Sequence, residues 1–276
     1  MDAAGRLMAQ LRARILGCGS SGGVPRLGAA GGHWGACDPD EPRNRRSRCS
    51  LLLTKVTEAG ETTVLIDTSP DMRAQLLAAN VTTLDGVIWT HPHADHVHGI
   101  DDLRMLAIGR QSRLPGWADA PTTEQLHARF GYIFETPAGS SYPPLVDLAP
   151  LDGPVTVEGA GGPLTLDSVL LQHGDIPARG ILCGGLAYLP DVNAIPDAAW
   201  ARLQGLEVLI VDALRRSPHP SHAHLDQALE WIAAAAPERA VLTNMHTDLD
   251  YHTLEAETPA HITPAFDGLE LELPLP

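Results

Sequence analysis

The chain has 276 residues, of which 44% are hydrophobic, and its 34 acidic residues outnumber its 19 basic ones for a formal net charge of −15. This charge disfavours a long nucleic acid as partner, because affinity for polyanions comes largely from lysine and arginine side chains. The sequence also has no run of 18 apolar residues and no secretory N-terminus, so we expect neither a membrane span nor a signal peptide. The hydrophobic fraction supplies a core without disulfides, and the four cysteines form no CxxC pair, so we expect a cytoplasmic protein with reduced thiols.

The first ninety residues alternate apolar runs with turns and one helical stretch. The predicted elements, in chain order, are a short strand at 13–16, a glycine-rich turn at 17–23, a hairpin of strands at 49–54 and 63–67, a helix at 71–80 and a buried strand at 87–90. This order indicates a layered α/β architecture. The glycine-rich turn lacks the Lys-Ser/Thr of a P-loop, and it is either a plain tight turn or a wall of an active site.

The rest of the chain continues this pattern after one interruption. Residues 110–150, rich in Pro, Gly, Ser and Asp, predict a peripheral excursion around a helix at 122–130, capped by Thr122 or Thr123. The later predicted elements are strands at 164–171, 181–189, 207–212 and 240–243 and a helix at 225–236. We therefore expect one domain over residues 1–276, with residues 1–12 as an N-terminal extension.

The strongest chemical signal is the run THPHADHVHG at residues 90–99, directly after a buried strand. In an extended segment residues i and i+2 project to the same side, so His91 and His93 can hold one metal ion. Asp95 and His96 follow where the chain turns into a helical stretch, and they would face a second ion. A solvated histidine-rich loop is the alternative interpretation.

Two adjacent ions need more ligands than this loop supplies, and the ends of later predicted strands offer three: His173, Asp191 and His246. A carboxylate such as Asp191 has two oxygens that could bridge both ions. Each of the three, taken alone, would more often be a structural or surface residue. Their recurrence at strand ends favours the interpretation as ligands.

The segment THPHADH resembles the HxHxDH motif of the metallo-β-lactamase superfamily. The order of features also resembles the phosphoribosyl cyclic-phosphate phosphodiesterase (PhnP-type) branch of that superfamily: a glycine-rich turn, Val24-Pro25, an arginine-rich loop, Cys49-Ser50, the HxHxDH motif, and late His, Asp and His residues. The similarity covers roughly residues 13–270. It implies an α/β fold, a four-layered αβ/βα sandwich with the metal site at one edge of its sheets.

The resemblance further implies two divalent metal ions, Zn²⁺ or Mn²⁺, and a role for each candidate residue. One ion would be bound by His91, His93 and His173, the other by Asp95, His96 and His246, and Asp191 would bridge them. Asp67 and Asp212 each close an apolar strand and would orient ligand histidines, as such sites need to fix the imidazole tautomer. An ordinary cap of a helix or turn is the alternative role for either aspartate.

Two features depart from the pattern of the branch. Related members have a Thr-His pair where this chain has Thr243-Asn244, so His246 can act as a ligand only if the backbone shifts to bring it inward. Some members also bind a third, structural zinc through clustered cysteines in the early loop. Here only Cys37 remains, with His33 nearby, so we expect no such site.

These expectations combine into a metal-dependent phosphodiesterase that cleaves a small, for example cyclic, phosphodiester with hydroxide formed at the metal ions. Asp95 and His222 would be catalytic, with His222 as general acid or phosphate donor unless it is a cap or surface residue. Arg46 and Arg48 would bind the substrate phosphate, unless the arginine run that they form with Arg43 and Arg45 is only a solvated face.

Two other functions stay open. Within the same superfamily the substrate could be a thioester, a lactone or a lactam, because fold does not fix substrate. The chain could also be a non-hydrolytic metal-binding protein of cofactor biosynthesis. We expect a small phosphorylated substrate as partner, and the sequence leaves a homodimer open.

Overall fold

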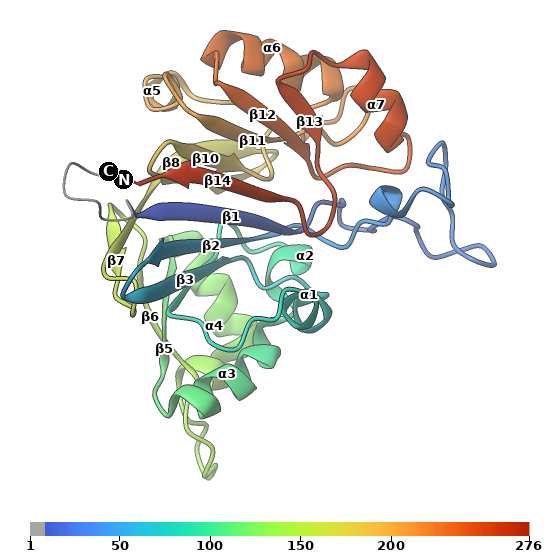
Figure 1. The fold of residues 1–276 in the computed structure, drawn as a ribbon. Coiled ribbons are helices and arrows are strands. Elements are labelled where there is room, and N and C mark those ends of the chain that lie inside the picture. The colour runs from blue at the N-terminus through green and yellow to red at the C-terminus, as the bar shows by residue number, and fades with distance from the viewer. Residues whose placement is uncertain (1–8, 276) are drawn as a thin grey trace. The chain divides into compact units, whose positions relative to one another are not determined.

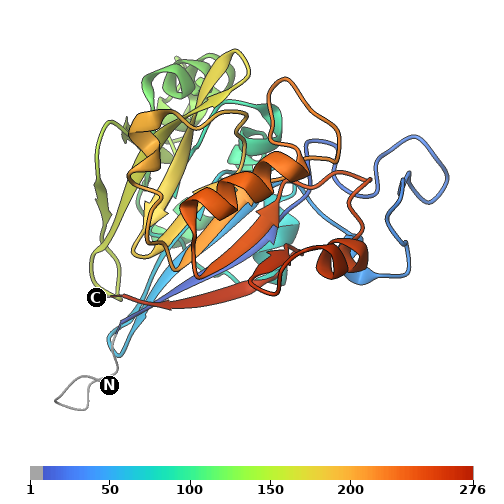
Figure 2. The same ribbon diagram turned by 90° about the horizontal axis from the view of Figure 1, so that it is seen from above.

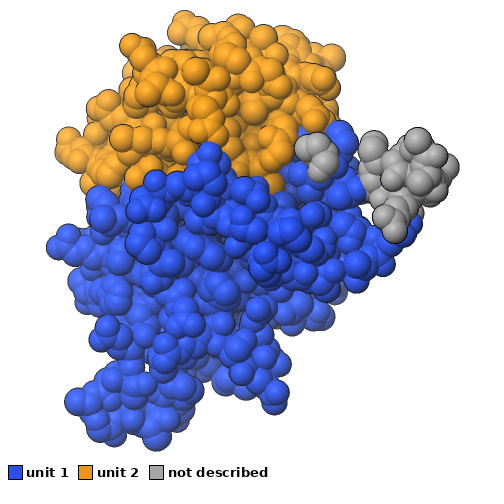
Figure 3. All heavy atoms as spheres, turned by 90° about the vertical axis from the view of Figure 1, so that its left-hand side faces the viewer, with its two compact units in different colours: residues 1–14, 50–167, 270–276 blue, residues 15–49, 168–269 orange. Residues whose placement is uncertain are grey.

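Figures 1 and 2 show the computed structural model of the chain, which describes residues 9–275. The chain divides into two compact units, coloured separately in Figure 3. Unit 1 contains the described residues 9–14, 50–167 and 270–275, and unit 2 contains residues 15–49 and 168–269. Each unit is therefore described by itself. Most of the predicted N-terminal extension lies outside the described residues.

Most strands of unit 1 belong to a seven-stranded sheet with the order β14-β1-β2-β3-β4-β5-β6. Its strands are β1 (Gln10–Gly17, which ends in unit 2), β2 (Ser50–Thr57), β3 (Gly60–Ile66), β4 (Gly86–Ile88), β5 (Leu114–Ala118), β6 (Val146–Pro150) and β14 (Glu270–Pro274). Strands β2 and β3 form the antiparallel hairpin expected from the sequence. From β3 to β6 the neighbours are parallel, so their carboxyl ends share one edge of the sheet.

The hydrophobic pattern explains this parallel region. The last five residues of β3 and all three of β4 are buried, as strands covered on both faces require. Asp67 directly follows β3, and the histidine-rich run at 90–99 follows β4. The sheet therefore delivers both segments to the same edge.

The helices of unit 1 are α1 (Met72–Ala78), α2 (Ala94–Val97), α3 (Leu103–Arg110) and α4 (Ala120–Phe134), with a short 3₁₀ helix at Ile100–Asp102. Helix α4 packs against β6. It begins earlier than predicted, because the Asp119 side chain, not that of Thr122 or Thr123, accepts the capping hydrogen bond. Residues 110–150 also differ from a peripheral excursion, since they contribute β5 and β6 to the sheet.

A second seven-stranded sheet has the order β13-β12-β11-β10-β9-β8-β7 and lies mostly in unit 2. Its strands are β7 (Val155–Val157), β8 (Leu164–His173), β9 (Ile176–Cys183), β10 (Leu186–Leu189), β11 (Val208–Asp212), β12 (Arg239–Thr243) and β13 (Ile262–Pro264). From β10 to β13 the strands are parallel, so Asp191, Asp212 and Asn244 lie at or just beyond the carboxyl ends of three neighbours.

The single strand predicted at 181–189 is two antiparallel strands. Gly184 has a φ of +56°, which a glycine adopts without steric cost, and the chain reverses there so that Cys183 pairs with Leu186. A continuous apolar run conceals this turn. The strands predicted at 207–212 and 240–243 and the helix at 225–236 are confirmed as β11, β12 and α6.

The helices of unit 2 are α5 (Asp197–Trp200), α6 (Leu225–Ala235) and α7 (Tyr251–Glu257), with a 3₁₀ helix at Pro42–Asn44. Helix α6 packs against β11 and α7 against β13, and Figure 2 shows α6 lying along the strands of the second sheet. Within residues 9–275 no helix has the length and apolar character needed to cross a bilayer.

Candidate metal centre

The histidine-rich loop of unit 1 brings imidazole rings together at the end of β4. The ring centroid of His91 lies 4.7 Å from that of His93 and 4.2 Å from that of His96. A ring nitrogen of His91 and one of His93 lie within 4.8 Å of each other, a spacing that suits binding of one cation. His93 has an extended backbone (φ −66°, ψ 151°) just before α2, so the alternation expected from the sequence is present.

Asp67 organises this loop from the end of β3. Its carboxylate is fully buried and accepts hydrogen bonds from the Thr90 backbone N–H (2.8 Å), the Thr90 hydroxyl (2.7 Å) and His96 Nδ1 (2.7 Å). The Thr90 hydroxyl also lies 3.0 Å from His91 Nδ1. Burial raises the pKa of the Asp67 carboxyl, and the neighbouring His96 opposes that shift. Because Asp67 and Thr90 engage the two Nδ1 atoms, Nε2 of each ring is the atom left for a metal.

Asp95 lies in the first turn of α2, next to the His96 ring. Its Oδ2 is 3.7 Å from His96 Nε2, and its side chain is 15% exposed. A carboxylate oxygen and an imidazole nitrogen therefore face a common point within unit 1. This pair suits the second cation site predicted from the sequence.

A helix outside the motif also holds the loop. Arg129 on α4 donates from Nη1 to the carbonyl oxygen of Pro92 at 2.7 Å, between the two histidines that suit one cation. The sequence offered no signal for this residue, because one arginine on an amphipathic helix is usually solvated.

Unit 2 contributes a second group of candidate ligands. His173 ends β8, and its Nδ1 donates to the carbonyl oxygen of Ser221 at 2.6 Å. A carbonyl oxygen can only accept, so this bond places the proton on Nδ1 and leaves a lone pair on Nε2. That Nε2 lies 3.6 Å from Oδ2 of Asp191, whose side chain is almost fully buried just after β10. His173 and Asp191 thus direct ligand atoms toward one another.

His222 lies beside this pair and is held by a buried aspartate. Its Nδ1 is 2.9 Å from Oδ2 of Asp212 and 3.6 Å from Oδ2 of Asp191, and its ring centroid is 4.6 Å from that of His173. Burial raises the pKa of Asp212 to about 7, against the lowering effect of His222. Since Nδ1 faces Asp212, His222 can exchange a proton with a substrate only through Nε2.

The loop after β12 presents Asn244, and not His246, to His222. Asn244 is buried, has a φ of +61°, donates to the carbonyl oxygen of Pro190 at 3.1 Å and lies 3.1 Å from His222 Nδ1. The His246 ring instead lies near Asp248 (3.4 Å), and its side chain is 23% exposed. Among the described residues of unit 2, His246 is outside the ligand group of His173 and Asp191. The inward shift that its predicted role requires is therefore not seen.

The arginine run is not a uniformly solvated face. Arg46 is 1% exposed, and its guanidinium donates to Asn44 Oδ1 (3.2 Å) and the His246 carbonyl oxygen (3.4 Å) and lies 4.0 Å from Cys37 Sγ. Through these contacts Arg46 holds the loop that contains Cys37 and Asn44. A side chain this deeply buried does not suit the direct contact with a substrate that the sequence predicted. Arg48 is half-buried and forms a backbone bridge with Gly19 of the glycine-rich turn.

Comparison with known proteins agrees with this arrangement. A family model described as a beta-lactamase superfamily domain matches residues 62–245. An octanoyltransferase of Porphyromonas gingivalis is 34% identical over 265 residues, which are 94% of this chain and 51% of that protein, so the chain spans about half the length of this relative.

Solved structures give the same result. A diphosphatase of the PhnP family has a TM-score of 0.84 and 33% identity, over 97% of this chain and 99% of that one. The Zn²⁺-bound PqqB of Methylobacterium extorquens has a TM-score of 0.71 and 21% identity, over 95% and 100% of the two chains, and supports the fold alone. The resemblance found in the sequence and the expected fold class are both confirmed.

Proposed function

We propose that this chain, which belongs to the β-lactamase superfamily, is a metal-dependent phosphodiesterase that hydrolyses small phosphorylated substrates. Its fold and its donor set support the coarser statement that it is a metal-binding hydrolase of the metallo-β-lactamase fold. In this proposal the candidate ligands bind two divalent ions, Zn²⁺ or Mn²⁺. The proposed ligands are His91, His93, Asp95, His96, His173 and Asp191.

The observation that carries the proposal is the orientation of the imidazoles. In unit 1 Thr90 and Asp67 engage Nδ1 of His91 and His96, and in unit 2 the Ser221 carbonyl engages Nδ1 of His173. Solvated or purely structural histidines have no need for a common tautomer. A shared Nδ1–H tautomer, which leaves the Nε2 lone pair of each ring for a metal ion, is what metal binding requires. The donor set fits Zn²⁺ or Mn²⁺ on this ground.

When bound, such ions would make a water molecule acidic enough to lose a proton at neutral pH and so become a nucleophile, and they would neutralise charge on the phosphate oxygens. The chain's own residues would do the rest. Asp212 holds His222 through Nδ1, so the Nε2 proton of His222 is directed away from Asp212 and can be given to the leaving oxygen. His222 would thus act as the general acid.

One observation supports a phosphate substrate, and another supports the small size of that substrate. The similar structure at 33% identity is described as a diphosphatase of the PhnP family, and its likeness covers nearly the whole chain. The net charge of −15 favours a small substrate over a long nucleic acid. We also propose a cytoplasmic location, because the four cysteines of the sequence form no CxxC pair. A homodimer stays a prediction of the sequence alone.

The test is hydrolysis of bis(p-nitrophenyl) phosphate by protein stripped with a chelator and reloaded with Zn²⁺ or Mn²⁺. We expect turnover only after reloading, and we expect Asp191→Ala to abolish it and to lower metal content. Asp248→Ala is the matched control, because Asp248 is a partly exposed aspartate of unit 2 that is not among the proposed ligands. Absence of turnover with either metal would contradict the proposal.

A second candidate is a non-hydrolytic role in cofactor biosynthesis, which is favoured by 26% identity to a coenzyme PQQ synthesis protein B of Xanthomonas campestris over 95% of this chain. The name of the octanoyltransferase relative raises acyl chemistry, but this chain matches only about half of that protein. A thioester and a lactone belong in the same assay panel. Faster turnover of either of these than of the phosphodiester would reassign the substrate while keeping the metal centre.

A further inference from the structure

A pocket of about 680 Å³ opens beside the histidine-rich loop of unit 1. It is lined by His93, Ala94, His98, Arg129 and Phe130. Two segments build it: α2 with its flanking histidines, and the middle of α4. His93 is both a wall of this pocket and a proposed metal ligand, so a phosphate held at the metal centre would have its ester group within reach of the pocket.

Arg129 gives this pocket a fixed positive charge. Its Nη1 donates to Pro92 at 2.7 Å and its Nη2 to Gln125 at 3.0 Å. A guanidinium has five N–H groups, so these two bonds orient the side chain and leave further donors for an anion. Among the described residues no acidic side chain lines this pocket.

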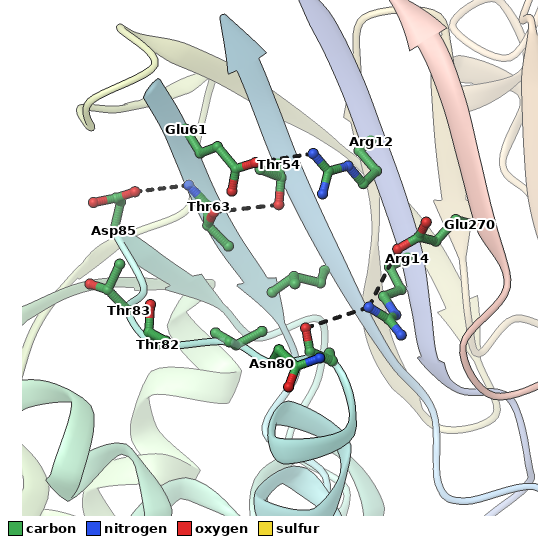
Figure 4. Close-up of a pocket in the computed structure, with 13 residues that line it drawn as sticks. Arg12, Arg14, Thr54, Glu61, Thr63, Asn80, Thr82, Thr83, Asp85 and Glu270 are labelled. Atoms are coloured by element: carbon green, nitrogen blue, oxygen red, sulfur yellow. Dashed lines mark hydrogen bonds and ion pairs between the residues drawn. The ribbon is translucent and has the colours of Figure 1, made fainter. Parts of the chain in front are cut away.

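Another pocket of unit 1 shows the opposite arrangement. It has a volume of about 210 Å³, and Figure 4 shows that its two arginines point toward acidic side chains. Arg12 pairs with Glu61 at 3.0 Å, and Arg14 lies 3.4 Å from Glu270. Its arginines are thus already neutralised. The Arg129 pocket is the better place for a negatively charged ligand.

Phe130 gives the pocket an aromatic wall. Its ring meets the ring of His98 edge to face, with centroids 5.6 Å apart and an interplanar angle of 82°. Helix α4 leaves helical geometry at this residue (φ −133°, ψ 31°), while His98 is the last residue of the α2 turn. Two rings at right angles form a corner into which a third flat ring can stack.

We propose that this pocket binds a planar aromatic group carried on the substrate's phosphate ester, with Phe130 stacking on the ring and Arg129 bonding to the phosphate. The inference rests on the proposed function, because it is His93 at the metal centre that makes the pocket part of the substrate site. The ring has two chemical sources, a nucleoside or a simple aryl ester, and both present a flat π surface next to an anion.

The test compares ligands that share a phosphate and differ in the ring. Dissociation constants are measured by isothermal titration with metal-loaded protein for adenosine 5′-monophosphate against ribose 5-phosphate, and for phenyl phosphate against methyl phosphate. We expect the ring to tighten binding about tenfold in at least one pair. The pair that shows the effect identifies the source. A ratio near one in both pairs overturns the inference.

Variants assign the effect to its residues. Phe130→Leu should remove the preference for the ring, and Phe130→Trp should keep it. Arg129→Met should weaken both members of a pair equally. Tyr132→Leu is the matched control, because Tyr132 is a partly exposed aromatic residue of α4 outside the pocket, and it should change neither ratio. A preference for the ring that survives Phe130→Leu contradicts the assignment.

The outcome separates this inference from the proposed function. Turnover of phosphodiesters without any preference for a ring would refute the pocket alone. A ring preference that depends on Phe130, in a protein that hydrolyses no phosphodiester, would refute the proposed function and leave a binding pocket. If Phe130→Leu fails to fold, the two ratios of the wild-type protein still decide.

Discussion

Asp67 offers the sharpest test of how the chain orients its proposed metal ligands. The substitution Asp67→Asn keeps the shape of the side chain and suits the backbone, because the φ of +65° at this position is one that Asn tolerates better than most residues. The amide can still accept from the Thr90 N–H, now 2.8 Å from Oδ1. It replaces the other oxygen, 2.7 Å from His96 Nδ1, by an N–H₂ group that cannot accept.

The expected cost falls on metal affinity more than on folding. With a donor facing Nδ1, the His96 ring must move its proton to Nε2, which is then no longer a ligand atom. Loss of such an orienting partner typically weakens metal binding 10- to 100-fold, or about 1.4–2.7 kcal/mol. Folding of the metal-free protein loses the two charged hydrogen bonds of Oδ2, to the Thr90 hydroxyl and to His96 Nδ1, but it no longer has to bury a carboxylate, whose pKa burial raises. We expect a net change in the free energy of unfolding of about 1 kcal/mol or less.

The assay has two parts. Zn²⁺ affinity is measured by competition with a chromophoric chelator, and the stability of the metal-free protein by urea unfolding. Asp101→Asn is the control, because Asp101 is an exposed aspartate of the same unit that pairs with Arg104 at 2.8 Å and is not among the proposed orienting residues. A Zn²⁺ affinity of Asp67→Asn within about threefold of the wild type would refute the reasoning about the tautomer.

Three further predictions follow from unit 2. His222→Gln should lower kcat for bis(p-nitrophenyl) phosphate by about 10²- to 10⁴-fold while Zn²⁺ content stays at the wild-type level. His219→Gln is the control with the milder expected effect, because the His219 ring centroid lies 5.1 Å from that of His222. A loss of bound Zn²⁺ in His222→Gln would instead make His222 a ligand. Arg46→Met should lower the free energy of unfolding by about 1–3 kcal/mol, because it removes the hydrogen bonds of a buried, charged guanidinium to Asn44 Oδ1 and to the His246 carbonyl oxygen, whereas exposed Arg45→Met should not; equal losses in urea unfolding would show that burial is irrelevant. Asp267 has a pKa raised to about 6 by burial, so the folded state binds a proton more tightly than the unfolded chain: stability from this group is present below about pH 4 and is lost as pH rises to about 6. Asp267→Asn should therefore be less sensitive than the wild type to a change from pH 4.5 to 6.5, and equal sensitivity in urea unfolding at the two pH values would argue against the assignment.

The sequence predicted those elements whose signal is local. The buried strands β3 and β4 of the first sheet and β11 of the second are short apolar runs, and an acidic residue or a histidine ends or follows each of them. The histidine-rich loop is a local signal of the same kind, since all of its proposed ligands lie within one heptapeptide. Two errors in elements were also local: the turn at Gly184 is hidden in an apolar run, and Asp119 caps α4 before the predicted start.

The parts that escaped prediction depend on contacts between distant segments. The burial of Arg46 comes from a bond to the carbonyl of His246, 200 residues away, which no local pattern reports. The Ser221 carbonyl that fixes the tautomer of His173 is a backbone atom and has no sequence signature at all. Arg129 is likewise 37 residues from the carbonyl that it holds. Side-chain type indicates what a residue can do, but only the fold decides what it touches.

The partners of three proposed ligand histidines come from their own units. Thr90 and Asp67 lie beside Nδ1 of His91 and His96 in unit 1, and the Ser221 carbonyl oxygen accepts from Nδ1 of His173 in unit 2. Asp67→Asn removes one of these partners, so we expect it to change the tautomer of His96. A metal that still binds to such a variant would then rely on the remaining proposed ligands, and unchanged NMR signals of the His96 ring in the metal-free variant would contradict this reasoning.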